Sequence, residues 1–125
     1  SFEAGQERQD LVFWKPDHGP IGGETLRAFH TRVTGFLDEL LADVAGGSTV
    51  LLVTHAGVID VTARWAYGIG SEANWTNEIE APNASIMEIA CWPDGRHPRG
   101  APTYFAVRRM ADTRHLTHDQ ISGID

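Results

Sequence analysis

The chain has 125 residues, of which 42% are hydrophobic, and this size and composition suit one globular domain over residues 1–125. Its formal net charge of -7 argues against a nucleic-acid or anionic-membrane partner, because both bind to a basic protein face. A single cysteine, Cys91, excludes an intramolecular disulfide, and no apolar run approaches the roughly 20 residues of a membrane span. With no signal-peptide pattern at its start, we expect a cytoplasmic protein.

The first long element is a helix that begins at Thr25. Residues 1–23 are rich in turn-forming residues and predict irregular structure, with at most a short helical piece from Asp10 to Trp14. From Thr25, the predicted N-cap, apolar residues recur every three and four positions until Gly46 and Gly47 end the run. These apolar residues are Leu26, Phe29, Val33, Phe36, Leu37, Leu40, Leu41 and Val44.

An apolar run and a second helix follow. The run Val50-Leu51-Leu52-Val53 predicts a strand over residues 48–54 that is buried on both faces, as interior strands of parallel sheets are. Helical spacing then resumes at Val58 and continues to about Tyr67. The backbone must therefore turn from strand to helix around Gly57.

The last third of the chain predicts a hairpin. A polar loop over residues 71–82 contains Trp75 as its one large apolar residue. Strand patterns over residues 85–92 and 103–109 follow, joined by a loop that is too long for a two-residue turn. We expect these strands to form a hairpin at the edge of the sheet.

The junction Thr54-His55-Ala56-Gly57 is the candidate functional site. In an open α/β sheet, ligands bind outside the carboxyl ends of the strands, where a helix N-terminus offers unpaired N–H groups and a positive dipole end. His55 would lie at the edge of this site, with the amides of Ala56 and Gly57 facing the ligand. The sequence therefore predicts a site for a phosphate or a carboxylate. Taken alone, such a histidine is more often structural than catalytic.

Four short segments, each a weak signal alone, occur in an order that is specific as a set. They are Gly22-Gly23-Glu24-Thr25-Leu26, Val53-Thr54-His55-Ala56-Gly57-Val58-Ile59, Pro82-Asn83-Ala84-Ser85-Ile86 and Asp112-Thr113-Arg114-His115-Leu116. The order resembles the histidine phosphatase superfamily, the phosphoglycerate-mutase-like proteins, over nearly the whole chain. In that family similar segments form the start of a long helix, the second histidine motif, the start of the next strand and an Asn-Asp-Thr-Ala-His-Leu ending.

This resemblance implies a partial phosphoglycerate mutase-like fold, an α/β three-layer αβα arrangement with a mainly parallel sheet and the hairpin on the C-terminal side. It also implies a phosphomonoester hydrolase that acts through a phosphohistidine on a small phosphorylated substrate, without a metal or other cofactor. His55 would be the second histidine, which with the amide of Ala56 stabilises charge on the phosphoryl oxygens. A phosphoglycerate mutase-type transfer is the less favoured alternative, because the segment before Asn83 is short.

The sequence departs from the family in one respect, since the Arg-His-Gly motif that carries the phosphoryl-accepting histidine is absent. We therefore expect this chain to be the C-terminal part of a histidine phosphatase-like domain whose nucleophile lies upstream, so that the chain alone is catalytically incomplete. Two alternatives stay open. The domain could be an inactive anion-binding or interaction module, or a separate polypeptide could supply the N-terminal segment. An exposed sheet edge would also favour a homo-oligomer.

Other polar residues have plainer interpretations. Glu24 is a weak candidate for substrate binding, and a charge in the first turn of a helix, where it favours the dipole, is the stronger interpretation. Three arginines in helical patterns, Arg27, Arg32 and Arg64, are expected at the surface, solvated or ion-paired. Cys91 lies in a strand pattern and is expected to be a packed, inert thiol.

Overall fold

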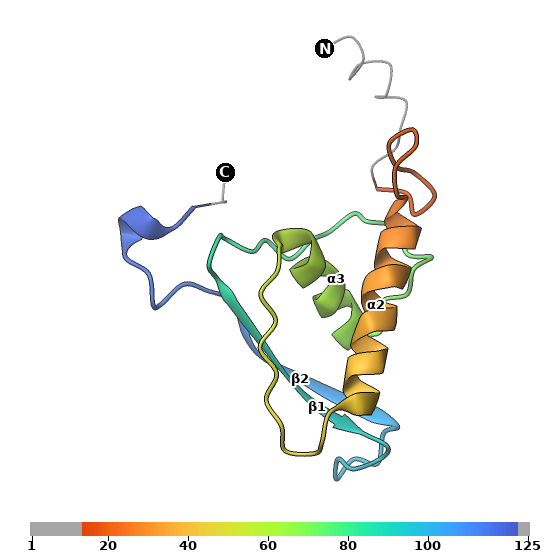
Figure 1. Ribbon diagram of the computed structural model, residues 1–125, viewed down its shortest axis with the longest axis vertical. Helices are drawn as coiled ribbons and strands as arrows, with labels where there is room; N and C mark the ends of the chain where they lie inside the picture. Colours follow the sequence, from red (N-terminus) through yellow and green to blue (C-terminus); the bar gives the residue numbers. More distant parts are fainter. Residues whose placement is uncertain (1–13, 123–125) are drawn as a thin grey trace.

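The structure is a computed structural model that describes residues 14–122 (Figure 1). Its elements are the helices α2 and α3, the strands β1 and β2 and the short 3-10 helix η2. Their bounds are Leu26–Asp43, Ala56–Ala66, Ile86–Pro93, Thr103–Asp112 and His118–Gln120, respectively. Of the short helical piece predicted near the start, only Trp14 lies within the described residues, and it is in a turn.

The predicted first helix is confirmed as α2. Thr25 is its N-cap, and the threonine side-chain oxygen accepts a hydrogen bond of 3.1 Å from the Ala28 amide. Its buried face carries His30, Val33 and Leu37, which are spaced at three and four residues as the sequence pattern requires. The spacing therefore places Val33 and Leu37 correctly, whereas Phe36 of the same pattern is 51% exposed and His30, which is not part of the pattern, is buried.

The core lies between α2 and α3. Val33 and Leu37 on α2 pack with Val61 on α3, which is fully buried. The partly buried residues around this cluster are Phe29, Val58, Trp65 and Trp75. Helix α3 also contacts the hairpin, where the ring of Trp65 meets that of Phe105 edge-on at 4.6 Å between centroids. Helix α3 therefore connects α2 to the sheet.

The predicted hairpin is also confirmed. Strands β1 and β2 pair antiparallel, and Trp92 lies opposite Tyr104 in the register. The register is irregular between Ile86 and Ile89, and Ala111 on β2 has a positive φ of 49° near this irregularity. The sheet of the described residues consists of these two strands.

The prediction of a mainly parallel sheet is wrong for the described residues, because their one sheet is an antiparallel hairpin. Residues 48–55 form no strand, and no backbone hydrogen bond joins residues 49–54 to any described part of the chain. Leu51 is 84% exposed and Val53 91% exposed, although the prediction buried both. The apolar run does not meet a neighbouring strand here, and a strand becomes part of a sheet only through such a neighbour.

Candidate functional site

The predicted site residues His55, Ala56 and Gly57 lie together at the N-terminus of α3. His55 is the N-cap, with extended backbone angles (φ −114°, ψ 163°), and its carbonyl oxygen accepts hydrogen bonds of 3.1 Å from the amides of Val58 and Ile59. Its imidazole is exposed and does not cap the helix. Among the described residues, the amides of Ala56 and Gly57 have no hydrogen-bond acceptor. Two free N–H donors thus lie beside an exposed imidazole at a positive helix end.

Packing against α2 supports this helix end. The ring of Phe29 lies against Gly57, and a Cβ added to the glycine would be 3.5 Å from Phe29 Cζ, an ordinary contact distance. The Arg32 guanidinium carbon lies 5.3 Å from the centroid of the same ring. Phe29 therefore links the first turn of α3 to a cation on α2.

Glu24, the weak candidate for substrate binding, is paired with this cation. Arg32 Nε and Nη2 donate to the two carboxylate oxygens of Glu24 at 2.9 and 3.0 Å. These hydrogen bonds hold the pKa of Glu24 below its ordinary value and raise that of Arg32. Glu24 precedes the N-cap, so the expectation of a first-turn charge is wrong. Both of its oxygens are occupied by Arg32, and its role toward substrate stays a prediction.

The expectation that Arg64 lies at the surface is wrong, since it is 3% exposed. Its Nε lies 3.5 Å from Asp60 Oδ1, and its Nη2 donates to the carbonyl oxygen and the side-chain oxygen of Asn77. Its guanidinium also lies 4.2 Å from the centroid of the Trp75 ring. Asp60 in turn accepts from the Ile79 amide at 3.1 Å. This buried pair holds the loop after α3 against α3, the helix whose N-cap is His55.

Sequence reasoning overlooked this pair, although a signal was present. Asp60 and Arg64 are four residues apart, so their side chains lie on the same face of the helix. The apolar Val61 lies next to Asp60 in the sequence. Opposite charges at this spacing usually indicate a solvated face, so the spacing alone does not show burial.

Cys91 is half-buried in β1, and burial raises the pKa of its thiol, which disfavours the reactive thiolate.

Neither a metal site nor a membrane helix is found within residues 14–122. No group of three or more His, Cys, Asp or Glu side chains there is placed to hold a metal ion. None of the helices described is both long and apolar enough to cross a membrane.

Comparison with known proteins gives one match. The sequence model of the histidine phosphatase superfamily (branch 1) matches residues 3–100, which is more than half of the chain. This range includes Glu24 and the His55 junction and ends before β2. No curated protein and no solved structure matches the chain.

Proposed function

The chain belongs to the histidine phosphatase superfamily, and from this membership we propose that it carries the second-histidine part of a phosphomonoesterase site. Membership of this superfamily supports the general type of activity, phosphatase or phosphotransferase. The finer proposal is hydrolysis of a small phosphomonoester through a phosphohistidine intermediate, in which His55, Ala56 and Gly57 hold the phosphoryl group.

The observation that carries the proposal is the arrangement at the start of α3. The free amides of Ala56 and Gly57 are fixed by the helix and can donate to two phosphoryl oxygens. The exposed imidazole of His55, when protonated, can stabilise the charge that develops on those oxygens during transfer. Donors that are already oriented need no rearrangement during the reaction, so they favour the transition state.

The attacking imidazole is a separate requirement. The chain has six histidines, and none lies in an Arg-His-Gly triplet. In our proposal the nucleophile therefore comes from a segment outside these 125 residues, and His55 has no nucleophilic role. The segment between α3 and β1 spans only residues 67–85, which leaves little chain for an elaborate lid and favours a hydrolase over a mutase.

Phosphate binding to the 125-residue chain tests the site directly. Inorganic phosphate, titrated against a sodium chloride series of equal ionic strength, should shift the backbone amide signals of Ala56 and Gly57 in a saturable way. His55→Ala should weaken this binding about tenfold, the loss expected for one charge-assisted contact. The matched control is His97→Ala, which removes an imidazole from the hairpin loop and should leave the binding unchanged.

Turnover tests the catalytic part. When an Arg-His-Gly segment is supplied, p-nitrophenyl phosphate should be hydrolysed, and His55→Ala should lower the rate by about 10²–10³-fold. Hydrolysis by the 125-residue chain that His55→Ala leaves unchanged would contradict the proposal.

The second candidate function is an inactive anion-binding domain, which the absence of an Arg-His-Gly triplet favours. The two functions differ in one result. An inactive domain binds phosphate at Ala56 and Gly57 and still hydrolyses no aryl phosphate when the Arg-His-Gly segment is supplied.

A further inference from the structure

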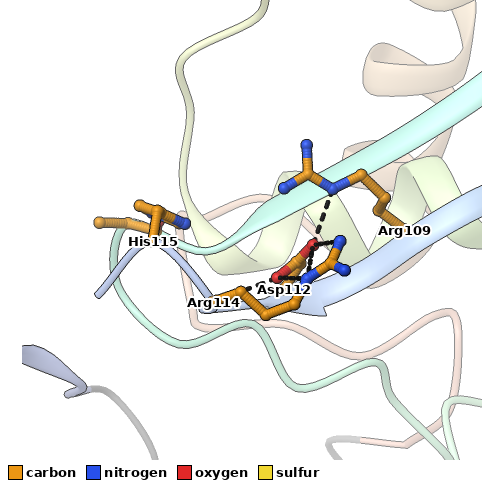
Figure 2. Close-up of polar contacts among 5 residues, drawn as sticks. Arg109, Asp112, Arg114 and His115 are labelled. Atoms are coloured by element: carbon orange, nitrogen blue, oxygen red, sulfur yellow. Dashed lines mark hydrogen bonds and ion pairs between the residues drawn. The ribbon is translucent and has the colours of Figure 1, made fainter. Parts of the chain in front are cut away.

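A second cluster of charges lies at the end of β2, on a different element from His55. The Asp112 side chain is 7% exposed and accepts a hydrogen bond of 2.7 Å from Arg109 Nε. Arg114 donates to the same carboxylate from its backbone amide at 3.0 Å, from Nε at 3.0 Å and from Nη2 at 2.6 Å. Figure 2 shows the carboxylate between the two guanidinium groups.

The side chains of Arg109, Asp112 and Arg114 together carry a net positive charge, although Glu88 lies opposite Arg109 in the strand register. Two guanidinium groups share one carboxylate, and both donate to the same atom, Asp112 Oδ2. Among the described residues, both Nη atoms of Arg109 and Nη1 of Arg114 have no hydrogen-bond acceptor. The side chains of Arg109 and Arg114 are 32% and 79% exposed, so these donors are accessible to a solute. Unpaired donors on two adjacent cations attract a second anion.

The surrounding backbone fixes the cluster in place. His115 Nε2 lies 2.7 Å from the carbonyl oxygen of Ala84, which connects the segment after β2 to the residues just before β1. The hydrogen bonds from Arg114 and Arg109 also lower the pKa of Asp112, so its carboxylate stays charged and keeps both guanidinium groups oriented. Donors that are already oriented lose less entropy when a ligand binds.

A purely structural role explains Arg109 better than Arg114. One arginine from within β2 already pairs with Asp112, and Arg114 adds a second cation from the exposed segment that follows the strand. Arg114 lies outside residues 3–100, so the match to the family model assigns it no role.

We propose that Arg109 and Arg114 form a binding site for an oxyanion of a small molecule, either a phosphate monoester or a carboxylate. Arg109 would contribute the amino groups of Nη1 and Nη2, and Arg114 that of Nη1, while Asp112 positions both side chains. A small anion is favoured over a nucleic acid because the net charge of -7 repels a long polyanion. The site does not depend on His55.

The test follows the side-chain Nε signals of Arg109 and Arg114 by NMR in the 125-residue chain. One titration uses inorganic phosphate and another uses acetate, each against sodium chloride of equal ionic strength. Saturable shifts with either anion support the site, and the anion that binds more tightly identifies the ligand chemistry. Shifts that sodium chloride reproduces overturn it.

Variants make the test specific. Arg114→Ala should weaken binding about tenfold, and it should fold because Arg114 is exposed. Arg99→Ala removes an exposed arginine of the hairpin loop that forms no ion pair with any described residue, and it should leave binding unchanged. If it weakened binding as much as Arg114→Ala, the effect would be general charge and the proposal would fail.

Two further variants separate this site from others. Glu88 lies opposite Arg109 in the strand register, so Glu88→Gln should strengthen anion binding by removing a competing charge. His55→Ala should leave the Arg109 and Arg114 signals and their affinity unchanged. Loss of binding in His55→Ala would show one shared site and overturn a separate one.

Discussion

The ring of Phe29 on α2 lies against Gly57 in the first turn of α3, where an added Cβ would be 3.5 Å from Phe29 Cζ. This is ordinary contact, and Gly57 is not among the residues with positive φ. Gly57→Ala should therefore stabilise the chain by about 0.5 kcal/mol, because alanine loses less backbone entropy than glycine in a helix. Urea denaturation measures the change, and phosphate binding should persist because the amide remains.

Gly22→Ala is the matched control for this variant. Gly22 has a φ of 74°, and no atom lies within 4 Å of a Cβ added there, so backbone strain alone decides the outcome. We expect a loss of about 1 kcal/mol. If Gly57→Ala were destabilised and Gly22→Ala unaffected, the backbone geometry described for both glycines would be contradicted.

The buried pair of Asp60 and Arg64 should dominate the stability of α3 and its loop. The two side chains are 11% and 4% exposed, so Asp60→Asn leaves a buried cation without its counter-charge. We expect a loss of about 3 kcal/mol in the free energy of unfolding. The exposed pair of Glu24 and Arg32 is the control, and Arg32→Met should change stability far less, because solvent screens that pair. Equal losses in the two variants would show that Asp60 and Arg64 are not buried together.

The Asp112 cluster should make stability depend on pH in acid. In the folded chain, hydrogen bonds from Arg114 and, to a smaller extent, from Arg109 hold the pKa of Asp112 far below its ordinary value. Such a carboxyl group stabilises the fold fully above its unfolded pKa of about 3.9, and this stabilisation is lost as the pH falls toward the folded pKa.

We therefore expect the unsubstituted chain to have a higher thermal midpoint of unfolding than Asp112→Asn near neutral pH. The difference between the two midpoints should shrink below about pH 5. Arg114→Ala, which removes the strongest cause of the pKa shift, should flatten the same acid dependence. A difference between the unsubstituted chain and Asp112→Asn that stays constant down to about pH 2 would exclude the ion pairs as its source.

Local patterns predicted those parts of the fold that depend on neighbours in the sequence. The cap at Thr25, the apolar spacing of Val33 and Leu37 and the hairpin strands all follow from residues within one element or one loop. Arg64 could not be placed in this way, because its burial depends on Trp75 and Asn77 in a loop more than ten residues away. The segment from Asp112 to Leu116 was recognised as a motif, but it does not include Arg109, and the sharing of one carboxylate by two arginines is seen only in the structure.

The backbone at Ala111 gives a further prediction. Its φ of 49° lies in the left-handed region, which is unfavourable for alanine. Ala111→Gly should stabilise the chain by about 0.5–1 kcal/mol in urea denaturation. Ala106→Gly, on the same strand without a positive φ, should destabilise it, because glycine weakens a regular strand. Destabilisation by both would show that Ala111 is unstrained.

The exposed run at Leu51 and Val53 provides the sharpest test between sequence pattern and structure. A strand buried on both faces predicts that Leu51→Ser and Val53→Ser each cost several kcal/mol, about as much as other large-to-small changes in a core. The structure, in which these side chains are 84% and 91% exposed, predicts changes within about 0.5 kcal/mol. Val61→Ala, at a fully buried position, should cost about 2 kcal/mol and calibrates the assay. If both serine variants were as destabilising as Val61→Ala, the run would be buried in solution, and the parallel-strand prediction would be restored.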